Sequence, residues 1–178
     1  MKININTKHV KRTGNDESNK FKNYLRMDRN ERVEGFKKGI LKKFKQNILN
    51  QDLIVYPKEN SLIRDLSNFL KIKKNKILIT PGSDAGLKYI FETFIKKNDK
   101  VASLEPSYAM FGFYSNFFKC KLLKLKYDQE FNISDEDIKK ITDQNIKIFY
   151  LANPNQPTGT SFNEKSLKKI LDISFKKN

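Results

Sequence analysis

The segment Thr-Pro-Gly-Ser-Asp-Ala-Gly at residues 80–86 combines a tight turn with residues that could bind an anion. It lies between an apolar run and a segment of helical periodicity, and Gly82 would make the turn because glycine adopts positive φ without steric cost. Ser83 and Asp84 would then stand at a helix N-terminus, where unpaired N–H groups and the helix dipole favour a phosphate. A plain N-cap role for Ser83 or Asp84 explains the same pattern, and is favoured for this segment taken alone.

A second segment, Asn-Pro-Asn-Gln-Pro-Thr-Gly at residues 153–159, directly follows the apolar run 146–151. A parallel strand delivers its carboxyl end to the ligand crevice of an α/β sheet, so this loop would lie beside a ligand. Asn155 or Gln156 could then hydrogen-bond that ligand. The alternative is a rigid turn with Asx chemistry. So many turn-forming residues in one loop make this motif more specific than the first.

Two further segments carry side chains that could serve a site. Tyr108 ends the sequence Glu-Pro-Ser-Tyr after another apolar run, and an aromatic residue there can stack on a planar ring or donate its hydroxyl. Packing at the start of a helix accounts for Tyr108 equally well. Asn30 and Glu31 precede the first helical pattern, where a polar loop with an N-cap is the alternative to a ligand contact.

The elements that must position these residues alternate along the chain. Periodicity predicts helices at 34–49, 62–70, 87–95, 108–118, 134–141 and 164–171, and short apolar runs predict strands at 77–80, 101–104, 122–127 and 146–151. We expect Asn60 or Ser61, Ser134 and Asn163 to cap three of these helices. Ser134 has Asp137 at capping-box spacing. This alternation predicts an α/β fold, with a mostly parallel sheet covered by helices on both faces.

Composition excludes several classes of protein. The chain has 178 residues and a net charge of +16, with 36 basic residues against 20 acidic ones. The lysines are spread over the predicted helix faces, and arginine is scarce, which favours a solvated surface over a nucleic-acid site. A single cysteine and a single histidine argue against an internal disulfide and the usual zinc sites. Cys120 is expected in the core, and His9 in a flexible, solvated arm at residues 1–25.

Neither a membrane nor a secretory route is indicated. No apolar run approaches the roughly 20 residues that a membrane-spanning helix needs. The opening Met-Lys-Ile-Asn begins no apolar signal-peptide core, so a cytoplasmic protein is expected.

Taken together and in this order, these segments resemble the N-terminal part of class I/II, fold-type I aminotransferases that depend on pyridoxal 5′-phosphate. The closest likeness is to the histidinol-phosphate aminotransferase-like group. The resemblance implies a mostly parallel sheet that is incomplete within this chain, in a partial domain over residues 26–178. It also implies amino-group transfer between an amino acid or related amine and a 2-oxo acid.

The same resemblance implies a role for each matching residue. Ser83 and Asp84 would bind the cofactor phosphate, Tyr108 would stack on its pyridine ring, and Asn155 or Gln156 would contact the 3′ oxygen. Gln156 occupies the position at which the family usually has the contacting asparagine. The remaining matches are Tyr56, which would reach a neighbouring subunit's phosphate and so implies a homodimer, and the substrate-side pair Asn30 and Glu31.

The family continues into segments that this sequence does not contain. These are an Asp-Glu-Ala-Tyr segment, a Ser-Lys segment whose lysine forms the Schiff base with the cofactor, and a later carboxylate-binding arginine. No arginine follows Arg64. We therefore expect a chain with no catalytic residue of its own that does not transaminate alone. A pyridoxal-phosphate-dependent decarboxylase of a phosphorylated amino acid, or a non-catalytic basic binding module, are the alternatives.

Overall fold

The computed structural model describes residue 32 and residues 34–175. The chain divides into two compact units, one within Lys11–Ile79 and the other formed mainly by Thr80–Asn178. The predicted arm at 1–25, with His9, and the pair Asn30 and Glu31 lie outside the described residues.

The unit that precedes residue 80 is helical in its described part. Its elements are α1 (Lys38–Asn47), η1 (Asn50–Leu53), α2 (Glu59–Leu70) and η2 (Lys74–Lys76). None of these four elements has a buried residue. The expected cap of α2 is wrong, because the helix begins at Glu59 with Lys58 as N-cap. Ser61 lies inside the first turn, where its hydroxyl donates to the Lys58 carbonyl at 3.0 Å, and the acidic Glu59 suits the positive end of the helix dipole.

The expected strand at 77–80 is also wrong. Ile77 has extended backbone angles, with φ −117° and ψ 125°, but residues 77–80 pair with no strand in the described part of the chain. An apolar run predicts burial, whereas a strand also needs a partner that supplies ladder hydrogen bonds. Over the residues that the structure describes, the sheet therefore has three strands where four were expected.

The three strands are parallel and lie in the order β2-β1-β3. Their bounds are β1 (Lys100–Glu105), β2 (Lys121–Lys126) and β3 (Ile148–Tyr150). The central strand β1 is buried from Val101 to Leu104, as a strand covered on both faces requires.

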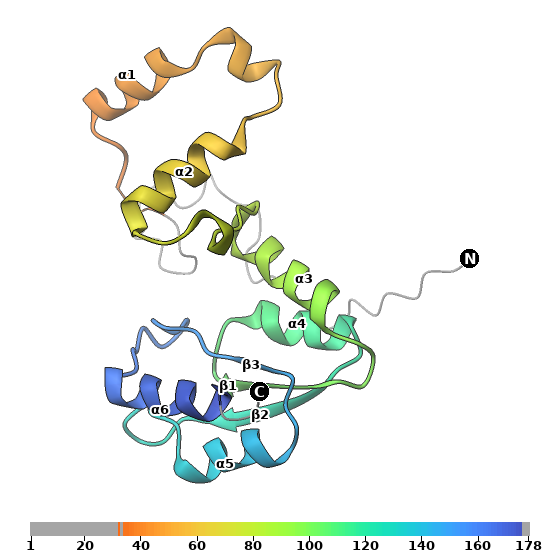
Figure 1. Ribbon diagram of the computed structural model, residues 1–178. Coiled ribbons are helices and arrows are strands. Elements are labelled where there is room, and N and C mark those ends of the chain that lie inside the picture. Colours follow the sequence, from red (N-terminus) through yellow and green to blue (C-terminus); the bar gives the residue numbers. More distant parts are fainter. Residues whose placement is uncertain (1–31, 33, 176–178) are drawn as a thin grey trace, which may run out of the picture. The chain divides into compact units, whose positions relative to one another are not determined.

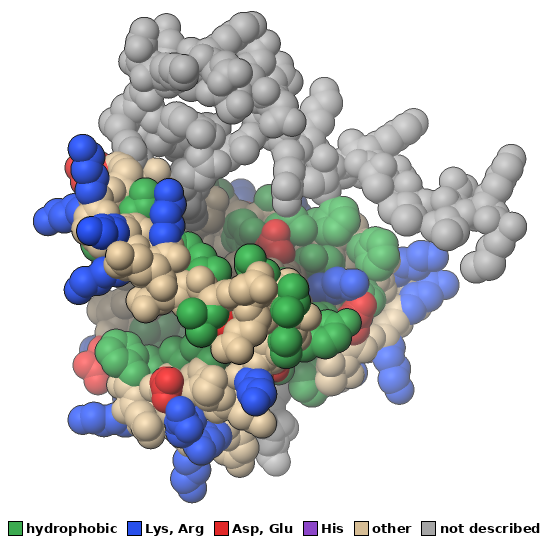
Figure 2. All heavy atoms as spheres, turned by 90° about the horizontal axis from the view of Figure 1, so that it is seen from above, with side chains coloured by type: hydrophobic (Ala, Val, Ile, Leu, Met, Phe, Trp, Pro, Cys, Tyr) green, Lys and Arg blue, Asp and Glu red, His purple; other side chains and the backbone are tan. Residues whose placement is uncertain are grey.

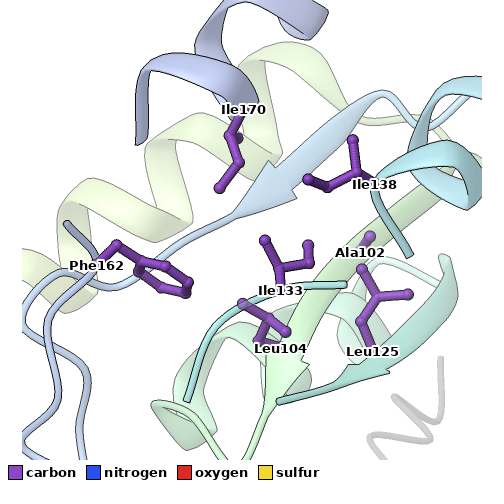
Figure 3. Close-up of a cluster of buried hydrophobic side chains, with 7 residues drawn as sticks. All are labelled: Ala102, Leu104, Leu125, Ile133, Ile138, Phe162 and Ile170. Carbon is purple, nitrogen blue, oxygen red and sulfur yellow. The ribbon is translucent and has the colours of Figure 1, made fainter. Parts of the chain in front are cut away.

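Helices cover both faces of this sheet, as Figure 1 shows. On one side lie α3 (Gly82–Phe94) and α4 (Ala109–Phe117), and on the other lie α5 (Asp135–Asp143) and α6 (Glu164–Phe175). Because successive side chains of a strand point to opposite faces, β1 contributes to two separate cores. Val101 packs with Phe91, Ile95 and Phe111. Figure 3 shows the other core, whose residues are Ala102, Leu104, Leu125, Ile133, Ile138, Phe162 and Ile170.

Two predicted caps are confirmed on this unit. Ser134 is the N-cap of α5, and its hydroxyl accepts the Asp137 backbone N–H at 3.1 Å. Asn163 accepts the Ser166 backbone N–H at 2.8 Å through its side-chain oxygen and so caps α6. Cys120 is half-buried and packs against the core that contains Phe91, which is close to its expected place.

Candidate functional site

The candidate site lies where β1 and β3 end. Because these strands are parallel neighbours, the loop at 106–108 after β1 and the loop at 151–163 after β3 meet at one edge of the sheet. The peptide bonds that precede Pro106, Pro154 and Pro157 are cis. Two side-chain hydrogen bonds join the loops, and their partners are 48 and 49 positions apart in sequence. The site therefore depends on tertiary contacts.

Asn155 is the buried centre of this edge, with only 3% of its surface exposed. Its Oδ1 accepts the Ser107 hydroxyl at 2.8 Å. Its Nδ2 donates to the Pro106 carbonyl at 3.0 Å and to Thr158 Oγ1 at 2.9 Å. The amide therefore binds the loop after β1 to its own loop.

Tyr108 connects this edge to the start of α3. Its hydroxyl donates to a carboxylate oxygen of Asp84, and both residues are half-buried. Tyr150, at the end of β3, stacks on Phe111 with ring centroids 4.7 Å apart. Burial and then the negative charge of Asp84 raise the pKa of Tyr150 above its ordinary value of 10.0. The site thus contains the carboxylate of Asp84 beside two tyrosines. Tyr108 donates its hydroxyl to this carboxylate, and Tyr150 keeps its proton at neutral pH.

The start of α3 has the features that an anion-binding helix end needs. Gly82 has a φ of +82°, and the turn is closed by its N–H on the Thr80 carbonyl at 2.7 Å and by the Thr80 hydroxyl on the Gly82 carbonyl at 2.8 Å. The N-cap position belongs to Pro81, which makes no side-chain cap hydrogen bond. The plain N-cap role considered for Ser83 or Asp84 is therefore wrong. Amide groups of the first turn that no side chain caps can bind a phosphate.

The structure brings together most of the predicted cofactor residues. Tyr108 and Asp84 share a hydrogen bond, and Asn155 bonds to Pro106 and Ser107, the two residues before Tyr108. Ser83 is exposed beside Asp84, and Gln156 is exposed beside Asn155. Tyr56 lies in the other unit, between η1 and α2, with 95% of its surface exposed.

Three residues that support this site were not predicted from the sequence: Ser107, Thr158 and Tyr150. Ser107 and Thr158 hold the amide of Asn155, and Thr158 also shares a hydrogen bond of 2.7 Å with Thr160. The signal for the first two was present, since both lie inside motifs that carry other candidates. Tyr150 lies within the apolar run 146–151, and nothing local separates it from an ordinary strand residue.

Two other kinds of site are absent from the described residues. They contain no group of three or more His, Cys, Asp and Glu side chains placed to hold a metal ion. None of their helices is both long and apolar enough to cross a membrane. On the face drawn in Figure 2, lysine and arginine side chains lie at several separate places.

The carboxyl edge of this parallel α/β sheet thus carries an uncapped helix start, a tyrosine and a buried amide, groups that are able to bind an anion beside a planar ring. The family model for aminotransferase class I and II matches residues 17–178. The chain therefore belongs to the class I and II aminotransferase family, whose members depend on pyridoxal phosphate. The expected family and fold class are confirmed.

Individual relatives agree with this assignment. A histidinol-phosphate aminotransferase of Clostridium beijerinckii is 32% identical over 160 residues, which are 89% of this chain and 43% of that protein. A dihydroxyacetone phosphate transaminase of Campylobacter jejuni is 28% identical over 84% of this chain and 42% of its own length. Histidinol-phosphate aminotransferase of Sinorhizobium meliloti, solved with pyridoxal 5′-phosphate, matches 78% of this chain and 38% of that one, with a TM-score of 0.69 at 20% identity. The chain thus spans less than half the length of these proteins.

Proposed function

We propose that this chain supplies the phosphate-binding and ring-binding half of a pyridoxal-phosphate-dependent transaminase site. The observation that carries the proposal is the uncapped start of α3 joined by the Tyr108–Asp84 hydrogen bond to the carboxyl edge of the sheet. A helix start and an aromatic ring in one place suit a ligand that has both a phosphate and a planar ring.

The residues present fit this cofactor. The backbone N–H groups of Ser83 and Asp84 would hold the phosphate, and the open space around Gly82, where an added Cβ would meet no atom within 4 Å, leaves room for it. Tyr108 would lie against the ring while its hydroxyl keeps the Asp84 carboxylate engaged. When bound, the cofactor supplies an electron sink for the amino-group transfer.

We propose that Gln156, rather than Asn155, meets the 3′ oxygen. Both N–H bonds of the Asn155 amide are already donated, to Pro106 and Thr158, and a primary amide has no third donor. Gln156 is the exposed neighbour and stands at the position of the family's contacting asparagine. We propose this role for Gln156, so that Asn155 makes no contact with the cofactor.

The substrates are proposed as an amino donor and a 2-oxo acid or ketone, one of which carries a phosphate. The names of two relatives support this class, since one takes its name from histidinol phosphate and the other from dihydroxyacetone phosphate. The proposal also includes a cytoplasmic homodimer in which the exposed Tyr56 reaches the partner's cofactor. It includes a substrate-side role for Asn30 and Glu31 as well.

We further propose that residues 26–178 form a partial domain that does not transaminate alone. After the loop at 153–159 the sequence contains no Ser-Lys segment of the kind that anchors the cofactor covalently in this family. Without that lysine the chain would bind pyridoxal phosphate reversibly and weakly, because the covalent anchor and proton carrier is lacking.

The function is tested on the natural polypeptide that carries these 178 residues, loaded with pyridoxal phosphate. Histidinol phosphate and dihydroxyacetone phosphate are each offered with a matching 2-oxo acid or amino acid, and histidinol and dihydroxyacetone serve as controls without phosphate. We expect amino transfer with a phosphorylated compound and at least about tenfold less with its control, since one lost charged hydrogen-bonding group costs at least that factor. Release of carbon dioxide from a phosphorylated amino acid, without amino transfer, would support the decarboxylase instead.

A further inference from the structure

The side chain of Asn155 has an unusual position for a residue in a loop. It is almost fully buried, and every hydrogen-bonding group of its amide has a partner in the chain. The orientation of that amide is fixed by chemistry, because the Pro106 carbonyl can only accept and must therefore face Nδ2. The backbone of Asn155 is held as well, by its N–H on the Thr160 carbonyl and its carbonyl on the Gly159 N–H, both at 2.8 Å.

The contacts of Asn155 bridge two segments that carry different parts of the site. Two of its three side-chain partners, Pro106 and Ser107, immediately precede Tyr108. The third, Thr158, belongs to the loop that also carries Gln156. Since Tyr108 begins α4 as its N-cap, fixing the two residues before it fixes where its ring and hydroxyl can lie.

We infer that Asn155 is a positioning residue, whose amide holds the segment 106–107 so that Tyr108 meets Asp84 across the start of α3. This inference rests on the proposed function. It adds that Asn155, which does not touch the cofactor, holds the proposed ring-binding tyrosine in position. Ser107 acts in the same way through its hydroxyl. The inference concerns a geometry that exists without ligand, so it can be tested without ligand.

The first variant is Asn155→Asp, which has nearly the same shape. It keeps an acceptor for the Ser107 hydroxyl but loses both donors, and it places a carboxylate against the Pro106 carbonyl. The matched control is Asn153→Asp in the same loop. Asn153 accepts the Phe162 backbone N–H at 3.0 Å through Oδ1, and a carboxylate can keep that bond while it introduces the same charge.

The primary readout is the hydroxyl-bearing ring carbon of Tyr108 in the full chain labelled with carbon-13 tyrosine, assigned by Tyr108→Phe. Loss of a carboxylate partner changes the chemical shift of this carbon. We expect the shift to move toward that of a free tyrosine in folded Asn155→Asp and to stay in place in Asn153→Asp. Denaturant unfolding is measured alongside, because a purely structural role would lower stability and leave the Tyr108 signal of the folded protein unchanged. That unchanged signal would overturn the inference.

A gentler variant covers the case in which Asn155→Asp does not fold. Ser107→Ala deletes one hydroxyl and leaves both amide donors in use, so we expect a smaller movement of the Tyr108 signal in the same direction. No movement in this variant would overturn the inference as well.

Ligand titrations separate the inference from the proposed function. Asn155→Asp should weaken binding of pyridoxal phosphate by about 2- to 10-fold, because the loss of one aromatic contact usually changes affinity by about that factor. The same variant should bind inorganic phosphate as well as the unmodified chain does. If neither ligand shifts the amide signals of residues 82–86 in the unmodified chain, the proposed cofactor site fails. The ligand-free Tyr108 signal then still decides whether Asn155 positions the tyrosine.

Discussion

Replacement of Gly82 by alanine isolates the cost of the left-handed turn at the start of α3. Gly82 has a φ of +82°, and a Cβ added there would meet no atom within 4 Å. The substitution therefore causes no collision with a neighbour, and only the backbone conformation opposes it. An L-residue in the left-handed region costs about 1–2 kcal/mol, so Gly82→Ala should lower the free energy of unfolding by about that amount.

Gly112→Ala provides a control with the opposite expected sign. Gly112 lies within α4 (Ala109–Phe117), and an added Cβ there also meets nothing within 4 Å. Alanine is more stable than glycine in the middle of a helix by about 0.5–1 kcal/mol. The two variants add the same methyl group to the same kind of open space, and their stabilities should differ by roughly 1.5–3 kcal/mol in favour of Gly112→Ala.

The assay is urea unfolding of the full chain followed by circular dichroism, with phosphate titration by NMR on each folded variant. Gly82→Ala should have a lower unfolding midpoint than the unmodified chain, and Gly82→Val a lower one still, because β-branched residues are the most strained at positive φ. Ser83→Ala should weaken phosphate binding only modestly, since the proposed site binds phosphate through backbone N–H groups. A Gly82→Ala variant as stable as Gly112→Ala would refute the assignment of a required left-handed turn.

Three further outcomes follow from the unit that contains the sheet. The Lys96 backbone N–H at 2.7 Å and the Lys147 ammonium at 3.0 Å hold the pKa of Asp99 below its ordinary value of 3.8. The stabilising effect of ionised Asp99 is therefore complete above about pH 3.8 and is lost as the pH falls through the lower pKa of the folded state. In urea titrations, the difference in unfolding free energy between the unmodified chain and Asp99→Asn should therefore shrink as the pH is lowered. Burial, and then the charge of Asp99, raise the pKa of the Cys120 thiol above 9.0, so iodoacetamide should react more slowly with the folded chain than with the urea-unfolded chain at mildly alkaline pH; equal rates would contradict this. Phe91→Ala should cost about 3–5 kcal/mol in the same unfolding assay because Phe91 is fully buried, whereas Phe94→Ala on the same helix, where Phe94 is 59% exposed, should change stability by no more than about 0.5 kcal/mol.

The sequence predicted those parts of the fold that depend on neighbouring residues. Ser134 and Asn163 cap their helices as expected, because a cap and its partner lie within three residues of each other. The strand expected at 77–80 was wrong, because its apolar pattern resembles that of 101–104 and only a pairing partner distinguishes the two. Strand pairing is a long-range property that local patterns do not carry.

The candidate site, like the fold, was predicted only where it depends on local sequence. The motifs that hold Asp84, Tyr108 and Asn155 were recognisable from the spacing of their turn residues. Their contacts join residues 24 and 48 positions apart, and the burial of Asn155 depends on the meeting of two loops. For this reason the sequence left both Asn155 and Gln156 as candidates, although Asn155 is buried and Gln156 is exposed in the structure.

The parallel sheet also implies an order of assembly. Val101 pairs with Leu122 on one side and with Ile148 on the other, so the second pairing closes a loop more than twice as long as the first. Closing the longer loop therefore costs about 0.7 kcal/mol more in chain entropy, because this cost grows with the logarithm of the loop length. We therefore expect β1 and β2 to associate first and β3 to dock afterwards. Since Asn155 follows β3, the polar cluster beside Tyr108 would be completed last, and hydrogen exchange should find it among the first parts of this unit to open.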